Sequence, residues 1–153
     1  MKKKGILFTA LCFLMLFLVT GCAKKTVITT SEFISKAEKA GYQTTDITAQ
    51  YSSYEYIKEA TIAKNDNYQV EFYVLDGEDK AKGMFDTNKT DFENSKGSSS
   101  SYSTVNLANY STYALTSAGK YMYLARVENT LIYIKVDEKY KDSVKGFVKD
   151  LGY

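Results

Sequence analysis

The side chains that most often carry out catalysis are scarce in this sequence. It contains no His, which removes the usual general base near neutral pH and the commonest metal ligand. A carboxylate pair, or a Ser activated by Lys, would need no His. No such pair is singled out by spacing, and the Gly-x-Ser-x-Gly motif of many hydrolases is absent. We therefore expect a protein that is not an enzyme and has no cofactor or metal, with a His-independent hydrolase as the remaining catalytic alternative.

Tyrosine is the residue type best suited to binding. The chain has 14 Tyr, and a Tyr ring combines apolar area with a hydroxyl, so that a group of rings can contact a sugar or a protein. Tyr is also common in strands for packing reasons, so both interpretations stay open. The possible ligand or partner contacts are Tyr54, Tyr56 and Tyr133, within a wider set that also contains Tyr51, Tyr110 and Tyr113.

Arg126 is the single Arg of the chain and lies in an otherwise apolar stretch. A guanidinium makes forked pairs with carboxylates that Lys does not reproduce. Arg126 is therefore a candidate for holding an anionic ligand. The alternative is a pair with an acid of the protein's own sheet, such as Glu71 or Glu59.

Two acidic clusters have the composition of calcium ligands without the spacing of a calcium loop. They occupy residues 65–67 and 76–79. We interpret the first as a turn and the second as the start of a helix.

The first 21 residues are typical of a secretory signal. Lys2, Lys3 and Lys4 form a cationic start, and a mostly apolar run follows from Ile6 to Val19. That run is too short to span a hydrocarbon core of about 30 Å comfortably as a helix. A plain transmembrane anchor is the alternative interpretation.

Val19-Thr20-Gly21-Cys22 resembles the lipobox of bacterial lipoproteins. The resemblance implies that cleavage removes residues 1–21 and that Cys22 carries a diacylglyceryl group. Two acyl chains anchor a protein stably, whereas one chain binds only reversibly. Residues 22–29 would then tether a domain of residues 30–153 to the extracytoplasmic face of the cell membrane. Because Cys12 would leave with the signal, no thiol would remain for disulfides, metals or catalysis.

The chain is also similar to small lipoproteins of Gram-positive gut bacteria. The similarity lies in residues 68–73, 129–133 and 151–153, together with the lipobox. Basic residues that are almost all Lys, with abundant Asn and Tyr, are typical of an AT-rich genome and favour the same source. This resemblance implies a location and no activity.

Net charge argues against nucleic acid as a partner. The whole chain has a formal charge of +2, with 20 basic and 18 acidic side chains. Removal of Lys2, Lys3 and Lys4 would leave 17 basic side chains and a net charge of −1. The basic footprint of a nucleic-acid-binding domain is therefore absent.

Hydrophobic patterns and capping residues predict three amphipathic helices. The first is expected over residues 30–40, with Thr29 or Thr30 as its cap and Gly41 at its end. The second follows Asp76, and the third follows Asp137 and ends at Gly152; both acids are expected to be N-caps.

The strands are expected to form two hairpins and a connecting meander. Residues 54–63 and 68–75 form the first hairpin, and residues 121–127 and 130–136 form the second, which is apolar on both faces. Residues 105–108 and 112–115 are weak strands. The Ser-rich residues 94–104 are expected to be a flexible loop.

Three one-sided helices must bury their apolar stripes on such a sheet. The sequence therefore predicts an α+β fold, with a mainly antiparallel sheet of about 5–7 strands and three amphipathic helices packed on it. The leading functional hypothesis is a non-catalytic protein-interaction module of the cell envelope. The alternative is a lipoprotein that binds a glycan or another small solute.

Overall fold

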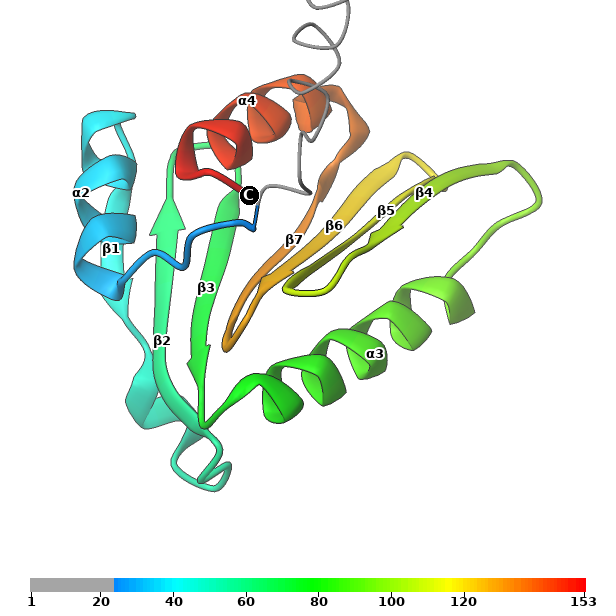
Figure 1. Ribbon diagram of the computed structural model, residues 1–153. Coiled ribbons are helices and arrows are strands. Elements are labelled where there is room, and N and C mark those ends of the chain that lie inside the picture. Colours follow the sequence, from blue (N-terminus) through cyan, green and yellow to red (C-terminus); the bar gives the residue numbers. More distant parts are fainter. Residues whose placement is uncertain (1–23) are drawn as a thin grey trace, which may run out of the picture.

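The computed structural model describes residues 24–153, and the signal segment and Cys22 lie outside the described residues. The strands form one seven-stranded sheet. Their order in the sheet is β1-β2-β3-β7-β6-β5-β4, and every neighbouring pair is antiparallel. The predicted α+β class is confirmed (Figure 1). In chain order the elements are α2 (Thr30–Lys39), β1 (Gln43–Asp46), η2 (Thr48–Tyr51), β2 (Ile57–Lys64), β3 (Gln69–Leu75), α3 (Glu78–Asn94), β4 (Ser100–Asn106), β5 (Tyr110–Ser117), β6 (Lys120–Val127), β7 (Thr130–Asp137), η3 (Glu138–Tyr140) and α4 (Lys141–Leu151).

The helices divide between the two faces of the sheet, with α2 and α4 on one face and α3 on the other (Figure 1). Each face has its own core. On the first face, Phe33 of α2 stacks on Phe72 of β3 with ring centroids 4.7 Å apart and lies 6.4 Å from the ring of Phe147 of α4. On the second face, Ala81, Phe85 and Phe92 of α3 are buried. The central strands β3, β7 and β6 are buried from both sides, as expected for the hairpin of β6 and β7.

The first helix begins at a complete capping box. The hydroxyl of Thr29 accepts a hydrogen bond from the Glu32 amide, and the Glu32 carboxylate accepts one from the Thr29 amide. These contacts satisfy amide donors that have no partner within the helix. The last helix ends, as predicted, at Gly152, whose φ of 97° lies in the left-handed region where glycine carries no steric penalty.

The other two predicted N-caps are wrong. Gly77, with a φ of 96°, precedes α3 and leaves Asp76 outside the helix, where its carboxylate lies 3.4 Å from the Lys58 ammonium. Asp137 precedes the short turn η3 and makes no side-chain cap; its carboxylate instead accepts a 2.5 Å hydrogen bond from Lys120 on the neighbouring strand. In both cases the α-helix begins later than expected, so that another residue takes the cap position, Gly77 for α3 and Tyr140 for α4.

The Ser-rich segment differs from the prediction of a flexible loop. Residues 100–106 form β4, which pairs with β5 in a continuous register from Ser100 opposite Ser117 to Asn106 opposite Ser111. Composition favoured a loop because Ser contributes little to a core. The backbone pairing does not need a core, since its hydrogen bonds are made to the exposed end of an existing sheet.

The first strand of the predicted hairpin starts later than expected. Residues 54–56 belong to the connection that follows η2, and β2 begins at Ile57. A register shift between Ile57 and Glu59 marks a bulge opposite the end of β3. A bulge adds a residue to one strand and bends it, which explains the irregular pattern of this segment.

Candidate binding surfaces at the sheet edge

Two of the three tyrosines singled out from the sequence come together. The rings of Tyr54 and Tyr56 meet edge to face with centroids 5.8 Å apart, and Tyr51 lies 6.4 Å from Tyr54. They line a shallow hollow of about 570 Å³ against α3. Tyr133 lies elsewhere on this face, 5.2 Å from the ring of Phe92 under α3. Tyr54 is the exposed member of the group, so these residues form a small aromatic patch rather than a deep site.

Arg126 is only 2% exposed and lies on the α3 face of β6. One terminal nitrogen donates to the Glu78 carboxylate at 3.1 Å and to the Glu128 carbonyl at 3.2 Å, and the other donates to the Ser111 hydroxyl at 3.3 Å. Its Nε has no hydrogen-bond partner among the described residues. The expected pair with Glu71 or Glu59 is therefore wrong, and the acid that pairs with Arg126 begins helix α3.

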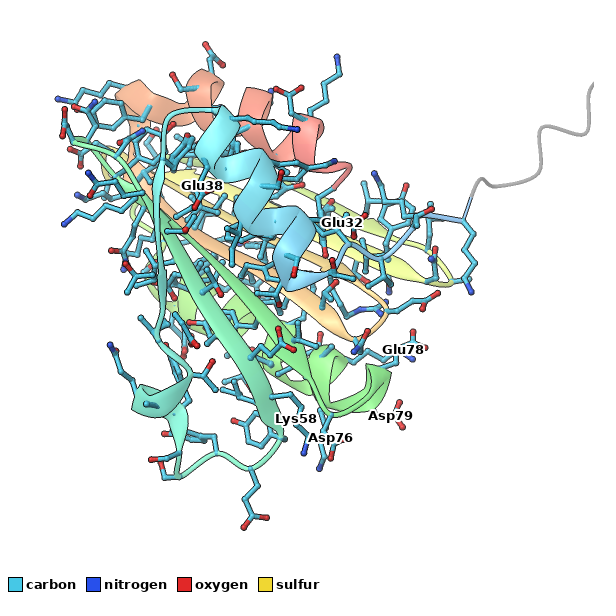
Figure 2. All side chains as sticks on the ribbon, turned by 90° about the vertical axis from the view of Figure 1, so that its left-hand side faces the viewer. Glu32, Glu38, Lys58, Asp76, Glu78 and Asp79 are labelled. Atoms are coloured by element: carbon cyan, nitrogen blue, oxygen red, sulfur yellow. The ribbon has the colours of Figure 1, made fainter. Side chains whose placement is uncertain are left out.

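Glu71 is occupied by groups of its own face. Its carboxylate accepts a 2.5 Å hydrogen bond from the Tyr73 hydroxyl and a 2.9 Å hydrogen bond from the Gln69 amide. Burial raises the pKa of the Tyr73 hydroxyl, and the negative charge of the adjacent Glu71 carboxylate raises it further. Figure 2 shows Glu78 near Asp79 at the start of α3, and the pair of Lys58 and Asp76 lies apart from them. A hydrogen bond from Lys82, together with the charge of Arg126, holds the pKa of Glu78 below its usual range.

The β4 edge is the most exposed regular part of the described protein. All seven residues of β4 are exposed, and within residues 24–153 the strand pairs with β5 alone. Three large hydrophobic side chains stand out on or beside it, with exposed fractions of 65% for Tyr102 and 41% each for Val105 and Leu107. The strand contains no charged residue and no Pro, which are two common means of blocking an edge.

The strands next to this edge carry no acid, although Asp86 of α3 and Glu138 of η3 lie near its two ends. No Asp or Glu occurs from Asn94 to Val127, a stretch that supplies all of β4, β5 and β6. Lys96 lies over the Tyr102 ring at 4.4 Å, and Lys89 of α3 lies 5.6 Å from the Tyr113 ring. On the opposite face of the sheet, Lys145 and Lys149 of α4 are exposed near the same strands. On the α3 side Lys89 is offset by Glu93, 3.9 Å away. The excess of positive charge at this edge therefore lies on the α4 side, although the net charge of the chain is small.

A groove runs beside β4 on the α4 face of the sheet. Its volume is about 560 Å³. The floor comes from Ala114 and Thr116 of β5 and Tyr121 and Tyr123 of β6, and the wall is α4. Burial raises the pKa of the Tyr121 hydroxyl and raises that of Tyr123 to about 12, so both remain neutral hydrogen-bonding groups near pH 7.

The first described residues lie against the domain. The Lys24 ammonium pairs with the Glu128 carboxylate at 2.8 Å, and the Lys25 ammonium donates to the Gly152 carbonyl at 2.9 Å. The backbone of Lys25 exchanges two hydrogen bonds with the Asn109 amide, at 3.2 and 2.7 Å. Ile28, a few residues later, is already part of the core. The segment expected to be a tether is thus held to the domain from Lys24 onward.

Sequence reasoning missed both the free edge and the groove. The acid-free stretch was visible in the sequence and is the signal that could have drawn attention to the edge. The groove depends on where α4 stops across the sheet, and no local pattern encodes that. In residues 24–153 no helix combines the length and hydrophobicity needed to cross a bilayer, and no group of three or more Cys, Asp or Glu is placed to hold a metal ion.

Comparison with known proteins leaves the family open. No family model matches the chain, and no curated protein matches it. The crystal structure of a GTP-binding regulator from Thermotoga maritima is similar with a TM-score of 0.47 and 21% identity, over 82% of this chain and 85% of the other. A similarity at this level supports no inference about what the chain binds.

Proposed function

We propose that the protein is a lipid-anchored module on the extracytoplasmic face of the cell membrane, and that it binds an extended acidic segment of another envelope protein along β4. The observation that carries the proposal is the fully exposed, uncharged edge of this strand. An unpaired strand edge presents a row of amide donors and carbonyl acceptors to which a second chain can add as a further strand.

The length and surroundings of β4 suit an added strand. Seven residues extend about 23 Å at roughly 3.3 Å per residue, enough to make several backbone hydrogen bonds. Tyr102 and Val105 provide exposed apolar area next to that edge. The other edge strand, β1, has four residues and ends in Asp46, so it is the poorer template.

Charge favours an acidic segment over a second copy of this chain. Lys96, Lys145 and Lys149 lie around the β4 edge, and the strands that form it contain no acid. Two copies paired through β4 would bring these positive regions together, and like charges across an interface are unfavourable. An acidic segment would instead be attracted, and its association would slow as salt increases.

Anchoring through Cys22 fits the contacts of the first described residues. A single residue, Ala23, separates Cys22 from Lys24, which is paired with Glu128. A lipid on Cys22 would therefore hold the domain within about 10 Å of the bilayer, since an extended residue spans at most roughly 3.6 Å. The end of the domain that carries Asn109 and Glu128 would face the membrane, and β4 would remain accessible from the side.

Site-specific crosslinking in cells tests the proposed partner site. A photoreactive amino acid is placed at Ser103 of β4 and, as a matched control, at Thr45 of β1 in the full chain. We expect the Ser103 probe alone to form an adduct that mass spectrometry maps to an acidic stretch of another envelope protein. Adducts shared equally by both probes, adducts only to a second copy of this chain, or no adduct at Ser103 would contradict the proposal.

The lipid anchor has a separate test. Cys22→Ser removes the thiol that would be acylated. We expect the variant to be released from membranes or to keep its signal segment, as judged by fractionation and intact mass. A mature, membrane-bound Cys22→Ser protein would show that the lipid assignment is wrong while leaving the β4 site open.

A further inference from the structure

We propose that the groove between α4 and the strands β4–β6 is a second binding site and that it takes an anionic carbohydrate. This site goes beyond the β4 edge, because it uses side chains on one face of the sheet rather than the backbone of the edge strand. The occupant is inferred from three features of the groove: an uncovered sheet surface, a row of lysines and a floor rich in hydroxyls and aromatic rings.

The groove exists because the helices on this face do not reach the end of the sheet. On the α3 face, the β5 residues Ser111, Tyr113 and Leu115 are buried. On the opposite face, Thr112 and Ala114 of the same strand are only half-buried. The second face has α4 against β6 and β7 but no helix over β4 and β5 (Figure 1). The result is a hollow of about 560 Å³, a size typical of small-molecule sites.

Lysines form one wall of the groove. Lys141, Lys145 and Lys149 recur every four residues along α4, which places successive Cα atoms about 6 Å apart along the helix. The Lys141 ammonium reaches across one end, 3.3 Å from the Thr116 hydroxyl and 5.5 Å from the centre of the Tyr121 ring. Asp142 of the same helix lies close enough for its negative charge to affect Tyr121. The wall is therefore mostly positive, with one acid nearby. Such a row matches a ligand with repeated negative charges.

The floor favours a sugar over a purely apolar anion. The rings of Tyr121 and Tyr123 stack with centroids 6.2 Å apart and an angle of 22° between their planes. Tyr121 is buried and supports Tyr123, which is only partly buried. The ring of Tyr123 can cover the apolar face of a sugar ring, and its hydroxyl can form a hydrogen bond. Ser101, Ser103 and Thr116 add further hydroxyls along the lining. Carboxylate or phosphate groups of the same ligand would reach the lysines.

Binding assays on the full, lipidated chain in detergent test this site with defined probes. We expect trigalacturonic acid to bind and neutral maltotriose to bind at least about tenfold more weakly, because only the first can pair with the lysines. The double variant Lys145→Glu/Lys149→Glu should bind trigalacturonic acid about tenfold more weakly, or weaker still. Lys39→Glu, an exposed change on α2, is the matched control and should leave the affinity unchanged.

A second variant fills the groove without changing its charge. Ala114→Trp places a large side chain on the half-buried floor and should abolish binding while thermal unfolding remains cooperative. Tripolyphosphate provides the decisive comparison. If it binds as tightly as trigalacturonic acid, or if Lys39→Glu weakens binding as much as the α4 changes, the groove is only a patch of positive charge and the proposal is wrong.

Two other results would also overturn the carbohydrate assignment. One is the absence of trigalacturonic acid binding to the wild-type chain. The other is a polyglutamate peptide that competes with trigalacturonic acid and whose binding is abolished by the same substitutions. That result would assign the groove to the protein partner of β4. Ser103 also lines the groove, so a protein adduct there is assigned to the β4 edge only if it persists in the Lys145→Glu/Lys149→Glu and Ala114→Trp variants, which leave the β4 backbone unchanged.

Discussion

The last residue of the chain is held by a hydrogen-bonded relay whose direction can be worked out. The Thr130 hydroxyl donates to the Val127 carbonyl at 2.7 Å and also contacts the Tyr153 hydroxyl. A hydroxyl has one proton to donate, so Tyr153 must be the donor to Thr130. Both side chains are buried, with exposed fractions of 9% for Tyr153 and 1% for Thr130. The relay ties the end of α4 to the turn between β6 and β7.

Because Tyr153 is the donor, Tyr153→Phe and Thr130→Val should lower the free energy of unfolding by different amounts. Tyr153→Phe removes one hydrogen bond but leaves Thr130 donating to Val127, so we expect a loss of about 1 kcal/mol in the free energy of unfolding. Thr130→Val leaves the buried Tyr153 hydroxyl without an acceptor and removes the donor to Val127. We expect that change to cost about 2–3 kcal/mol, because an unsatisfied buried group carries its full desolvation penalty.

Urea unfolding of the two single variants and the double variant measures this difference. The double variant should be less destabilised than the sum of the single variants, because Tyr153→Phe removes the hydroxyl that Thr130→Val leaves unpaired. Equal costs for the two single changes, or a larger cost for Tyr153→Phe, would refute the donor assignment. Additive costs would show that the two hydroxyls do not interact in solution.

Three further predictions test the packing of the helices and the burial of the tyrosines. In urea unfolding, Phe33→Ala should lower the free energy of unfolding by about 3–5 kcal/mol, because Phe33 is fully buried and stacked on Phe72. Ile34→Ala, on the half-buried side of the same helix, should lower it by about 1 kcal/mol. Similar losses for the two variants would contradict the central role of Phe33. Thr29→Ala should cost about 1 kcal/mol in the same assay, through loss of the capping box. Burial stabilises the neutral form of Tyr123 and raises its pKa to about 12. Because a Tyr in the unfolded chain ionises at about pH 10, the free energy of unfolding should fall as the pH rises from about 10 to about 12. Tyr123→Phe should make this fall measurably smaller.

Local signals account for most of the fold that the sequence predicted. The sequence left the first cap open between Thr29 and Thr30, and the structure selects Thr29. The helix end at Gly152 and the turn at residues 128–129 depend on a few neighbouring residues, and both were placed correctly. The β6–β7 hairpin was also correct, including its burial from both faces, because its two strands are apolar at both odd and even positions.

The errors arise where the sequence pattern does not fix the exact start of a helix or a distant partner. Asp76 and Asp137 have the right type for N-caps, but α3 and α4 start after them, and the two acids pair with Lys58 and Lys120 of other strands. Arg126 pairs with Glu78, 48 positions away in sequence, rather than with an acid on a neighbouring strand. Such partners depend on how α3 crosses the sheet, which the helical pattern does not determine.

The candidate sites were predictable to a smaller degree than the fold. Of the expected contact residues, Tyr54 and Tyr56 lie together because they are two positions apart in one connection, whereas Tyr133 and Arg126 lie elsewhere. The β4 edge was hidden because Ser-rich composition predicts flexibility, whereas pairing with β5 supplies the order. Tyr121 and Tyr123 belong to the hairpin that the sequence predicts to be apolar on both faces, and only the limited reach of α4 makes them line a groove.

Amide hydrogen exchange of β4 tests the central claim most directly. The acidic segment identified by crosslinking at Ser103 is added as a synthetic peptide to the full chain, and a peptide of the same length with its acids replaced by Lys is the control. An added strand would pair with the outward amides of residues 100–106, so we predict that alternate amides of β4 become protected with the acidic peptide only. Unchanged exchange in β4, or protection confined to β1, would contradict the proposal that this edge is the binding site.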